Sequence, residues 1–306
     1  MTVDDIIFIF RGVVPIGRTT VSKTVCWGFE SLRPCTLTMK IFYFILGCIL
    51  SITAVGQTVH GISAKSYIVT ELDGTIVLQK DILTPRPIAS ITKLLIAEQV
   101  VPNISTTNSV IIGSADLASR TSHSRLRLNS ELREDQLVRL SLISSNNSAV
   151  YALARTHGTE KVISSVNRIA QERGLSSIFI EEPSGLSANN QANVADLAKF
   201  VALVHDTDTA KISTEPTVSI GKNIFKSTNP LLAKPGWNFG VSKTGFINAA
   251  GGCLATIVEI GGRQVVVVIL GSANTKTRWL DLIKIRLFLA ETDVFWSPKI
   301  TLKGKK

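Results

Sequence analysis

The stretch Ala89–Ala97, ASITKLLIA, carries a serine and a lysine within an otherwise mostly apolar run. Apolar residues recur from Ile91 to Val101 at close to the 3.6-residue period of an α-helix. Pro87 lies just before this run and Pro102 ends it, as is typical of a helix that is bounded at both ends. The pattern therefore predicts a buried helix that holds two polar side chains.

Ser90 and Lys93 are i and i+3, so on a helix their side chains can meet on one face. Burial disfavours the charged form of an amine, so we expect the pKa of Lys93 to be lowered. A neutral amine beside a serine hydroxyl is a general base beside a nucleophile. The alternative is a surface helix with a chance serine and lysine, and Ser219 and Lys222 form a second pair with this spacing. The apolar surroundings of Ser90 and Lys93 favour this first pair as the nucleophile and its base.

Two further motifs carry polar side chains in defined settings. The sequence SSNN at Ser144–Asn147 separates helical patterns over Glu134–Ile143 and residues 149–154. A loop between packed helices holds side chains facing a cleft, although serine and asparagine also favour simple turns. The sequence KTG at Lys243–Gly245 occurs once in the chain, within the strand-like run Val241–Phe246. If it is not part of a functional site, the tripeptide is simply an edge strand that ends in a turn.

The remaining pattern mixes strands and helices within one domain. Strand-like runs at Ser66–Thr70 and Thr75–Gln79 are joined by an Asp-Gly turn, which predicts a hairpin. A second hairpin joins Cys253–Ile260 to Gln264–Leu270, whose valine run is typical of a central strand that is covered on both faces. Residues 103–133 are mostly polar and irregular. Helical patterns also extend over Glu160–Arg173, Val194–His205 and Trp279–Ala290.

The N-terminal region predicts export. Residues 39–56 combine one positive charge, a short apolar run and an Ala-x-Gly exit, which is typical of a secretory signal peptide. We expect translation to start at Met39, so that residues 1–38 are a doubtful extension and residues 57–306 form the mature domain. The mature chain then keeps only Cys253 and has no internal disulfide, which suits a periplasmic protein. A lipoprotein cleavage site at Cys48 is a weaker alternative.

The composition of the chain limits the kinds of binding partner that we expect. The chain has 306 residues and a formal net charge of +10, which suits a nucleic acid, an anionic membrane surface or an acidic polymer. An Arg/Lys-rich run, zinc-ligand spacing and aromatic-basic interleaving are all missing from the sequence, so no nucleic-acid partner is expected. The apolar run near the N-terminus is shorter than the roughly 20 residues that a membrane span needs, so we expect at most peripheral membrane contact. The four histidines are scattered and predict no metal site.

The three motifs occur in the order Ser90-x-x-Lys93, Ser145-x-Asn147 and Lys243–Gly245, which is the signature of serine acyltransferases that act on penicillin. With these motifs and the sequence PSGL that starts at Pro183, the chain resembles the low-molecular-mass penicillin-binding proteins, the D-alanyl-D-alanine carboxypeptidases and endopeptidases, over roughly residues 63–290. The resemblance implies an α/β (α+β) fold of the β-lactamase/transpeptidase type. Its five-stranded antiparallel sheet would be flanked by helices, with an all-helical cluster on one side.

The resemblance also implies catalytic roles. Ser90 would attack a peptide carbonyl and become acylated, and Lys93 would take its proton. Ser145 would relay a proton to the leaving amine. Lys243, one of the substrate-binding residues, would assist this step electrostatically. Water would then release the acyl group, and neither a metal nor an organic cofactor is required.

The remaining implied residues bind substrate. Asn147 would hydrogen-bond the substrate amide, and Thr244 would help to hold the carboxylate of the substrate or of penicillin. Gly245 would let the backbone approach the substrate closely. The backbone N–H groups of Ser90 and Phe246 would form an oxyanion hole.

The implied substrate is the crosslinked stem peptide of peptidoglycan, and β-lactam antibiotics would act as covalent inhibitors. About 16 residues follow the last predicted helix, too few for a second β-rich domain or an amphipathic anchor, which favours an endopeptidase over a carboxypeptidase. A class A-like β-lactamase is one alternative, but Glu181 and Glu182 lead into PSGL rather than a Glu-x-x-Leu-Asn loop. A catalytically inactive wall-binding protein of the same fold is another alternative, and the intact motifs argue against it.

Overall fold

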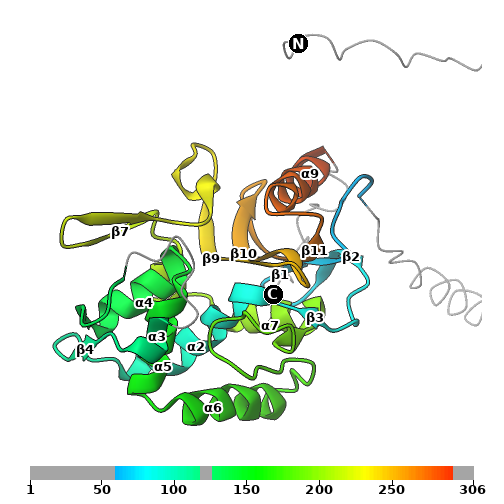
Figure 1. The fold of residues 1–306 in the computed structure, drawn as a ribbon. Helices are drawn as coiled ribbons and strands as arrows, with labels where there is room; N and C mark the ends of the chain where they lie inside the picture. The colour runs from blue at the N-terminus through cyan, green and yellow to red at the C-terminus, as the bar shows by residue number, and fades with distance from the viewer. Residues whose placement is uncertain (1–58, 118–125, 292–306) are drawn as a thin grey trace, which may run out of the picture. The chain divides into compact units, whose positions relative to one another are not determined.

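A five-stranded antiparallel sheet runs through the computed structural model, which describes residues 59–117 and 126–291 (Figure 1). The expected extension and signal peptide, residues 1–38 and 39–56, lie outside these residues. The spatial order of the strands is β2-β1-β11-β10-β9, and every neighbouring pair is antiparallel. This is the five-stranded antiparallel sheet that the resemblance implies. The strands are β1 (Ser66–Glu71), β2 (Ile76–Lys80), β9 (Phe239–Ile247), β10 (Gly251–Ile260) and β11 (Arg263–Ser272).

Helices cover both faces of this sheet. Helix α7 (Val194–Val204) packs on one face and α9 (Thr277–Glu291) on the other, on opposite sides of the sheet in Figure 1. Because successive strand residues point to opposite faces, alternate valines of β11 enter two separate apolar cores. Val266 and Val268 join the core on the α7 side, and Val265 and Val267 join the core on the α9 side. The predicted central strand is therefore confirmed.

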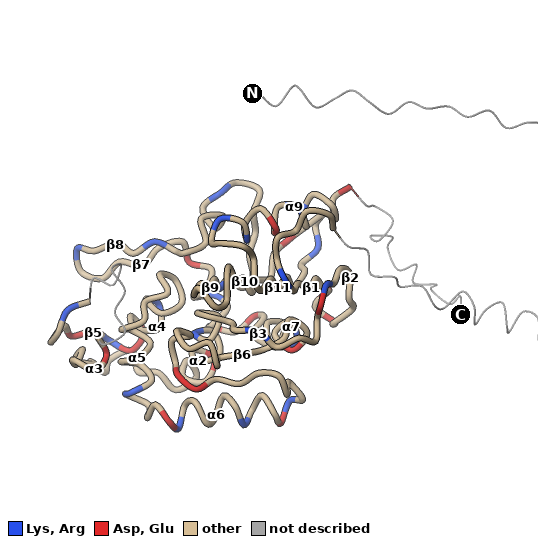
Figure 2. Tube along the Cα trace, turned by 45° about the vertical axis from the view of Figure 1, so that its right-hand side comes forward, with Lys and Arg blue, Asp and Glu red and all other residues tan. Residues whose placement is uncertain are grey.

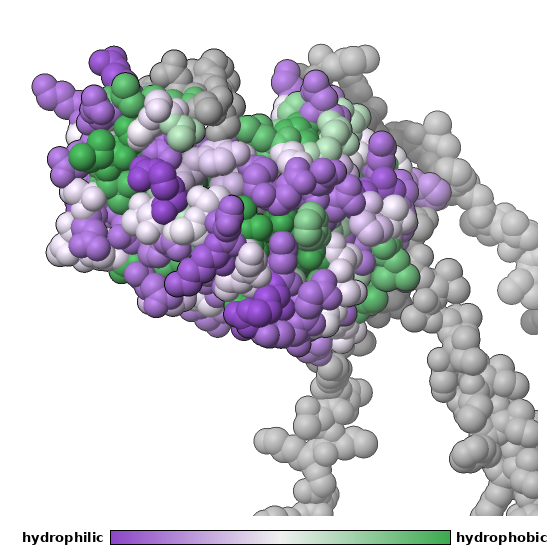
Figure 3. All heavy atoms as spheres, turned by 60° about the horizontal axis from the view of Figure 1, so that its bottom comes forward, coloured by the Kyte–Doolittle hydropathy of each residue, from purple (hydrophilic) through white to green (hydrophobic). Residues whose placement is uncertain are grey.

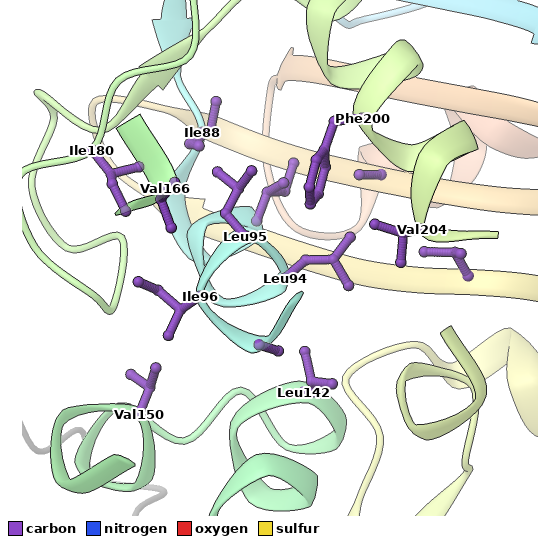
Figure 4. Close-up of a cluster of buried hydrophobic side chains, with 14 of the residues drawn as sticks. Ile88, Leu94, Leu95, Ile96, Leu142, Val150, Val166, Ile180, Phe200 and Val204 are labelled. Carbon is purple, nitrogen blue, oxygen red and sulfur yellow. The ribbon is translucent and has the colours of Figure 1, made fainter. Parts of the chain in front are cut away.

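The second helical layer surrounds the stretch that carries Ser90 and Lys93. This stretch forms one 3₁₀ turn, η2 (Ala89–Ile91), and then α2 (Thr92–Val100), in which seven of the nine residues are buried. Figure 4 shows Leu95 of α2 on the side of Phe200 and Ile96 on the side of Val150. The surrounding helices are α4 (Glu134–Ile143), α5 (Asn147–Thr156), α6 (Thr159–Glu172) and α8 (Asp208–Ser213). This is the predicted all-helical cluster.

Shorter elements complete the described part of the chain. The region 103–133, expected to be mostly irregular, also contains a short helix and a two-stranded sheet. The second Ser-x-x-Lys pair lies in the hairpin of β7 and β8, where Ser219 and Lys222 are both exposed. The short elements are β3 (Arg86–Pro87), η3 (Val101–Asn103), β4 (Ser109–Ile111), α3 (Ser114–Leu117), β5 (Glu131–Arg133), β6 (Gln191–Ala192), β7 (Thr217–Ile220), β8 (Asn223–Lys226) and η4 (Pro230–Ala233).

The surface of the described residues is mixed in charge and mostly polar. The outer helix α6 carries both signs of charge, with Lys161 and Arg168 between Glu160 and Glu172 (Figure 2). On the face turned forward in Figure 3, hydrophilic side chains surround smaller apolar patches. Within residues 59–117 and 126–291, every helix is too short or too polar to cross a lipid bilayer.

One close backbone contact positions the loop that holds PSGL. Gly185 has φ +83° and lies so near η2 that a Cβ atom added to it would be 2.0 Å from the carbonyl oxygen of Ala89. The obstructing atom belongs to the backbone and cannot rotate away. Only glycine therefore fits this position, both for its φ angle and for the space available.

Replacing Gly185 with alanine is expected to lower the free energy of unfolding by about 3 kcal/mol or more, because it adds a backbone clash to an unfavourable φ angle. Gly174→Ala is the matched control, since Gly174 has φ +69° with no atom within 4 Å of an added Cβ. Its expected cost is about 1 kcal/mol, from the φ angle alone. Urea unfolding measures both variants, and equal losses would contradict the close contact.

Candidate active site

Ser90 and Lys93 meet at the start of α2. Ser90 lies in the turn η2 and is partly exposed, whereas the Lys93 side chain is fully buried one turn later. Their Oγ and Nζ atoms are 2.8 Å apart, so the predicted i, i+3 contact is formed. Burial separates this pair from the exposed Ser219 and Lys222, which have the same spacing.

Three oxygen atoms surround the Lys93 amine. Its Nζ lies 2.8 Å from Ser90 Oγ, 2.8 Å from Asn147 Oδ1 and 2.5 Å from the carbonyl oxygen of Ser184. A neutral amine has two N–H donors and one lone pair, while amide and carbonyl oxygens only accept. When the amine donates to Asn147 and Ser184, its lone pair is left to accept the hydroxyl proton of Ser90. The other acceptor near this hydroxyl, the Ser184 carbonyl, is farther away at 3.4 Å.

The surroundings of Lys93 keep a large fraction of its amine neutral near pH 7. Burial lowers the pKa of Lys93 to about 7, and the negative charge of Glu182 partly opposes this shift. An amine with a pKa close to the working pH combines a useful neutral fraction with enough basicity to accept a proton. The geometry and the protonation state of Lys93 therefore both suit a general base.

Ser145 and Asn147 come from the junction of α4 and α5. Ser145 adopts a left-handed conformation with φ 56°, which is uncommon for a residue with a side chain. Asn146 caps α5 by accepting a hydrogen bond from the backbone N–H of Ala149 at 3.1 Å. The sequence pattern placed Asn147 in the loop between the two helices. In the structure it is the first residue of α5. The cap fixes where Asn147 starts the helix and so where its amide meets Lys93.

Strand β9 closes the site from the other side. Lys243 is 1% exposed, and its Nζ donates to Ser145 Oγ and to the carbonyl oxygen of Thr244, each at 3.0 Å. A Cβ added to Gly245 would be 2.9 Å from the backbone nitrogen of Ser90, so glycine lets β9 lie directly against η2. Thr244 is buried, and its hydroxyl donates to Thr228 Oγ1 at 2.6 Å. Phe246 is 42% exposed, beyond the point of closest approach.

Arg278, on α9, is a site cation that no sequence motif predicted. Its side chain is 7% exposed, and Nη1 donates to the carbonyl oxygen of Gly245 at 2.8 Å. Burial, followed by the charges of Lys93 and Arg278, lowers the pKa of Lys243 well below its ordinary value. No local sequence signal marks Arg278, because it reaches the site only when α9 folds over β9 and β10.

The sequence motifs also did not predict that the Ser184 carbonyl and the Glu182 side chain belong to the site. PSGL was noted as part of the resemblance, but a backbone carbonyl carries no residue signature. In the sequence, Glu182 is notable only because it leads into PSGL rather than into the Glu-x-x-Leu-Asn loop of a class A β-lactamase. In the structure its carboxylate faces Lys93 and accepts hydrogen bonds from the PSGL loop.

The Cys253 thiol does not have the properties of a nucleophile. Cys253 is a buried free thiol, as expected, and burial raises its pKa to about 11, which disfavours the nucleophilic thiolate. In the two described segments, no three His, Cys, Asp or Glu side chains are grouped so that they could hold a metal ion.

The site brings one serine and one buried amine together on a helix, with a second serine and amine where an edge strand meets an interhelical loop. This is the arrangement of a serine acyl-transfer enzyme with a lysine base. A model of the D-alanyl-D-alanine carboxypeptidase family matches residues 53–274, and the chain belongs to this family.

Individual proteins agree with this assignment. The D-alanyl-D-alanine endopeptidase of Escherichia coli (strain K12) is 30% identical over 237 residues, covering 72% of this chain and 75% of that protein. The crystal structure of a D-alanyl-D-alanine carboxypeptidase from Mycobacterium tuberculosis matches with a TM-score of 0.71 at 23% identity, covering 81% of this chain and 96% of that chain. The crystal structure of ampicillin-bound penicillin-binding protein D2 from Listeria monocytogenes matches with a TM-score of 0.66 at 25% identity, covering 75% of this chain and 98% of that chain. The family model and the E. coli relative confirm the resemblance to the D-alanyl-D-alanine carboxypeptidases and endopeptidases, and the solved structures confirm the fold.

Replacing Lys93 with methionine is expected to flatten the pH dependence of stability. The pKa of Lys93 is about 7 in the folded protein and near 10.5 in the unfolded chain. At pH values between these two, the unfolded state therefore binds more protons than the folded state. The free energy of unfolding of the wild type therefore rises above about pH 7, by up to about 1.4 kcal/mol per pH unit for one such group. Urea unfolding between about pH 6 and pH 8.5 measures this slope.

Lys222→Met is the matched control, since Lys222 is the exposed lysine of the second Ser-x-x-Lys pair. This variant is expected to keep the wild-type slope, whereas Lys93→Met reduces it. A wild-type slope in Lys93→Met would contradict a native amine that loses its proton near neutral pH.

Proposed function

We propose that this chain is a serine-type D-alanyl-D-alanine peptidase that works through an acyl-enzyme on Ser90. The observation that carries the proposal is the 2.8 Å contact between Ser90 Oγ and the buried amine of Lys93, whose N–H groups face two acceptors. Membership of the D-alanyl-D-alanine carboxypeptidase family supports the same chemistry.

In the proposed reaction, Ser90 Oγ attacks the carbonyl carbon of a D-alanyl peptide bond while Lys93 Nζ takes the hydroxyl proton. The C–N bond of the tetrahedral intermediate then breaks, and the leaving amine receives a proton from the Ser145 hydroxyl. Ser145 is placed for this step because its Oγ lies 3.0 Å from Lys243 Nζ, which can return a proton to it. Water then attacks the resulting ester and gives up one proton, which restores Lys243. As the acyl group leaves as the acid, Lys93 returns to Ser90 Oγ the proton that it took in the first step.

The groups that we assign to substrate binding surround Ser90 and lie on η2, α5 and β9. We assign the substrate amide to Asn147 and the substrate carboxylate to Thr244, with the buried charges of Lys243 and Arg278 behind the strand favouring an anion. The carbonyl oxygen of the scissile bond would accept from the backbone N–H groups of Ser90 and Phe246. Each such donor is typically worth about 3 kcal/mol of transition-state stabilisation.

The natural substrate that we propose is crosslinked peptidoglycan, cleaved in the periplasm after export by the signal peptide at residues 39–56. The E. coli relative is named an endopeptidase, which favours crosslink cleavage over removal of a terminal D-alanine. β-Lactams would acylate Ser90 in place of substrate, and the ampicillin-bound form of the Listeria protein supports this part of the proposal.

Rapid β-lactam hydrolysis is not the function that the site favours. A β-lactamase of class A needs a carboxylate that is available to activate the deacylating water. The carboxylate of Glu182 instead accepts hydrogen bonds from the Ser184 backbone N–H at 2.7 Å, the Ser184 hydroxyl at 2.6 Å and the Tyr151 hydroxyl at 2.9 Å. With its oxygens held in this way, Glu182 has little capacity left for a water molecule.

Ser90→Ala is expected to abolish covalent labelling by a fluorescent penicillin, because it removes the attacking oxygen. Ser219→Ala is the matched control, with the same substitution in the exposed Ser-x-x-Lys pair, and it is expected to label at the wild-type rate. Gel fluorescence and intact mass measure the adduct. An unlabelled wild type, or equal labelling of Ser90→Ala, would reject the acyl-enzyme.

Digestion of purified peptidoglycan is expected to convert crosslinked muropeptide dimers into monomers. Mass spectrometry of the products, with Ser90→Ala as the control enzyme, measures this conversion. Loss of terminal D-alanine without a decrease in dimers would instead identify a carboxypeptidase.

A further inference from the structure

We propose that Glu182 is a positioning residue for the general base: its carboxylate holds the Ser184 carbonyl against the Lys93 amine and places a negative charge beside it. This inference rests on the proposed function and assigns a role to a residue outside its three motifs.

The first argument is the set of donors that converge on the Glu182 carboxylate. They come from two separate parts of the chain: helix α5, and the segment between Glu182 and β6. Backbone N–H groups of a single loop provide three of them, so the carboxylate acts as the centre around which that loop folds. The donors are the N–H groups of Ser184, Gly185 and Ser187, the hydroxyls of Ser184 and Tyr151, and the side-chain amide of Asn190.

The second argument is what this loop gives to the site. Folding around Glu182 brings the Ser184 carbonyl to 2.5 Å from Lys93 Nζ. This carbonyl is one of the two acceptors that take the N–H groups of the neutral amine and leave its lone pair for Ser90. If the carbonyl moved away, the lone pair could turn from the hydroxyl, and base catalysis would lose its alignment.

The third argument is a second connection from Glu182 to the nucleophile. The amide of Asn190 that donates to Glu182 also donates to Thr92 Oγ1 at 3.1 Å. Thr92 in turn donates to the carbonyl oxygen of Ala89 at 2.8 Å, in the residue before Ser90. Glu182 is thus connected to both sides of the Ser90–Lys93 contact, through Ser184 on one side and through Asn190 and Thr92 on the other.

The charge of Glu182 has its own effect. The charged groups around Lys93 are Glu182 in the loop and Lys243 on β9, with Arg278 of α9 acting on Lys243. The negative charge of Glu182 therefore acts on the buried amine of Lys93 and partly opposes the effect of burial on its pKa. Hydrogen bonds from Ser184 and Tyr151 keep the pKa of Glu182 below its ordinary value, although burial, the largest single cause, raises it.

Glu182→Gln and Glu182→Asp separate positioning from charge. Glutamine keeps the size of the side chain but removes the charge and turns one acceptor into a donor that faces other donors. Its expected penicillin acylation rate at neutral pH is about tenfold or more below wild type. Because the anion is lost, the pKa of Lys93 falls further, and the midpoint of the acid limb of the pH–rate profile moves below about 7.

Aspartate keeps the charge but is one methylene shorter, so the acylation rate is expected to fall while the midpoint stays at the wild-type pH. Glu181→Gln is the matched control: it removes the same charge from the neighbouring exposed residue and is expected to leave rate and midpoint unchanged. Thermal unfolding of each variant reports its folded state before the kinetics are measured.

If Glu182→Gln does not fold, Tyr151→Phe provides the test, because it removes one hydrogen bond to the carboxylate. It is expected to slow acylation about threefold or more. Tyr67→Phe, at a buried tyrosine whose hydroxyl contacts only the backbone N–H of Val59 among the described residues, is its control and leaves the rate unchanged.

The outcomes separate the two proposals. A wild type that penicillin does not label rejects the proposed function itself. A labelled wild type with a Glu182→Gln variant of equal rate and equal midpoint rejects only the role of Glu182. A slower Glu182→Gln with an unmoved midpoint also overturns the proposal, because a purely structural residue would change the rate without changing the protonation of Lys93.

Discussion

Burial of the Lys93 amine is the constraint on which the site depends. A buried cation without solvent is costly, and a protein relieves that cost by lowering the pKa, by hydrogen bonds or by an opposite charge. All three are present here: the pKa of Lys93 falls to about 7, Asn147 and Ser184 offer acceptors, and Glu182 offers charge. The groups that stabilise the amine are thus the groups that aim it at Ser90.

Close backbone packing makes this burial possible. Gly185 and Gly245 approach the Ala89–Ser90 backbone, and a Cβ atom on either glycine would lie within 2.9 Å of the Ser90 nitrogen. Ala89 itself has φ 48°, a strained conformation that persists only when its surroundings hold it in place. Loop and strand together therefore fix the peptide bond before Ser90 and leave little room for the hydroxyl to move relative to Lys93.

Local signals in the sequence predicted most of the fold and part of the site. Helix α4 was predicted to the residue because its apolar positions lie between a polar start and a Ser/Asn run that ends it. The β7–β8 hairpin and α8 were missed because such short elements depend on tertiary packing. The motif side chains were identified because each has a distinctive residue type and spacing. The Ser184 carbonyl and Arg278 were missed, since a backbone oxygen has no signature and the burial of Arg278 is created by α9 crossing the sheet.

The position of the acidic group explains why similar serine–lysine sites can differ in the lifetime of their acyl-enzymes. A carboxylate that keeps a free oxygen near the ester can activate water, whereas one that is saturated by N–H and O–H donors can only orient its neighbours and contribute charge. Glu182 belongs to the second kind, because it accepts from the loop, from Tyr151 and from Asn190. In the reaction that we propose, these hydrogen bonds would keep the base for acylation aligned and would leave Glu182 little capacity to activate a deacylating water.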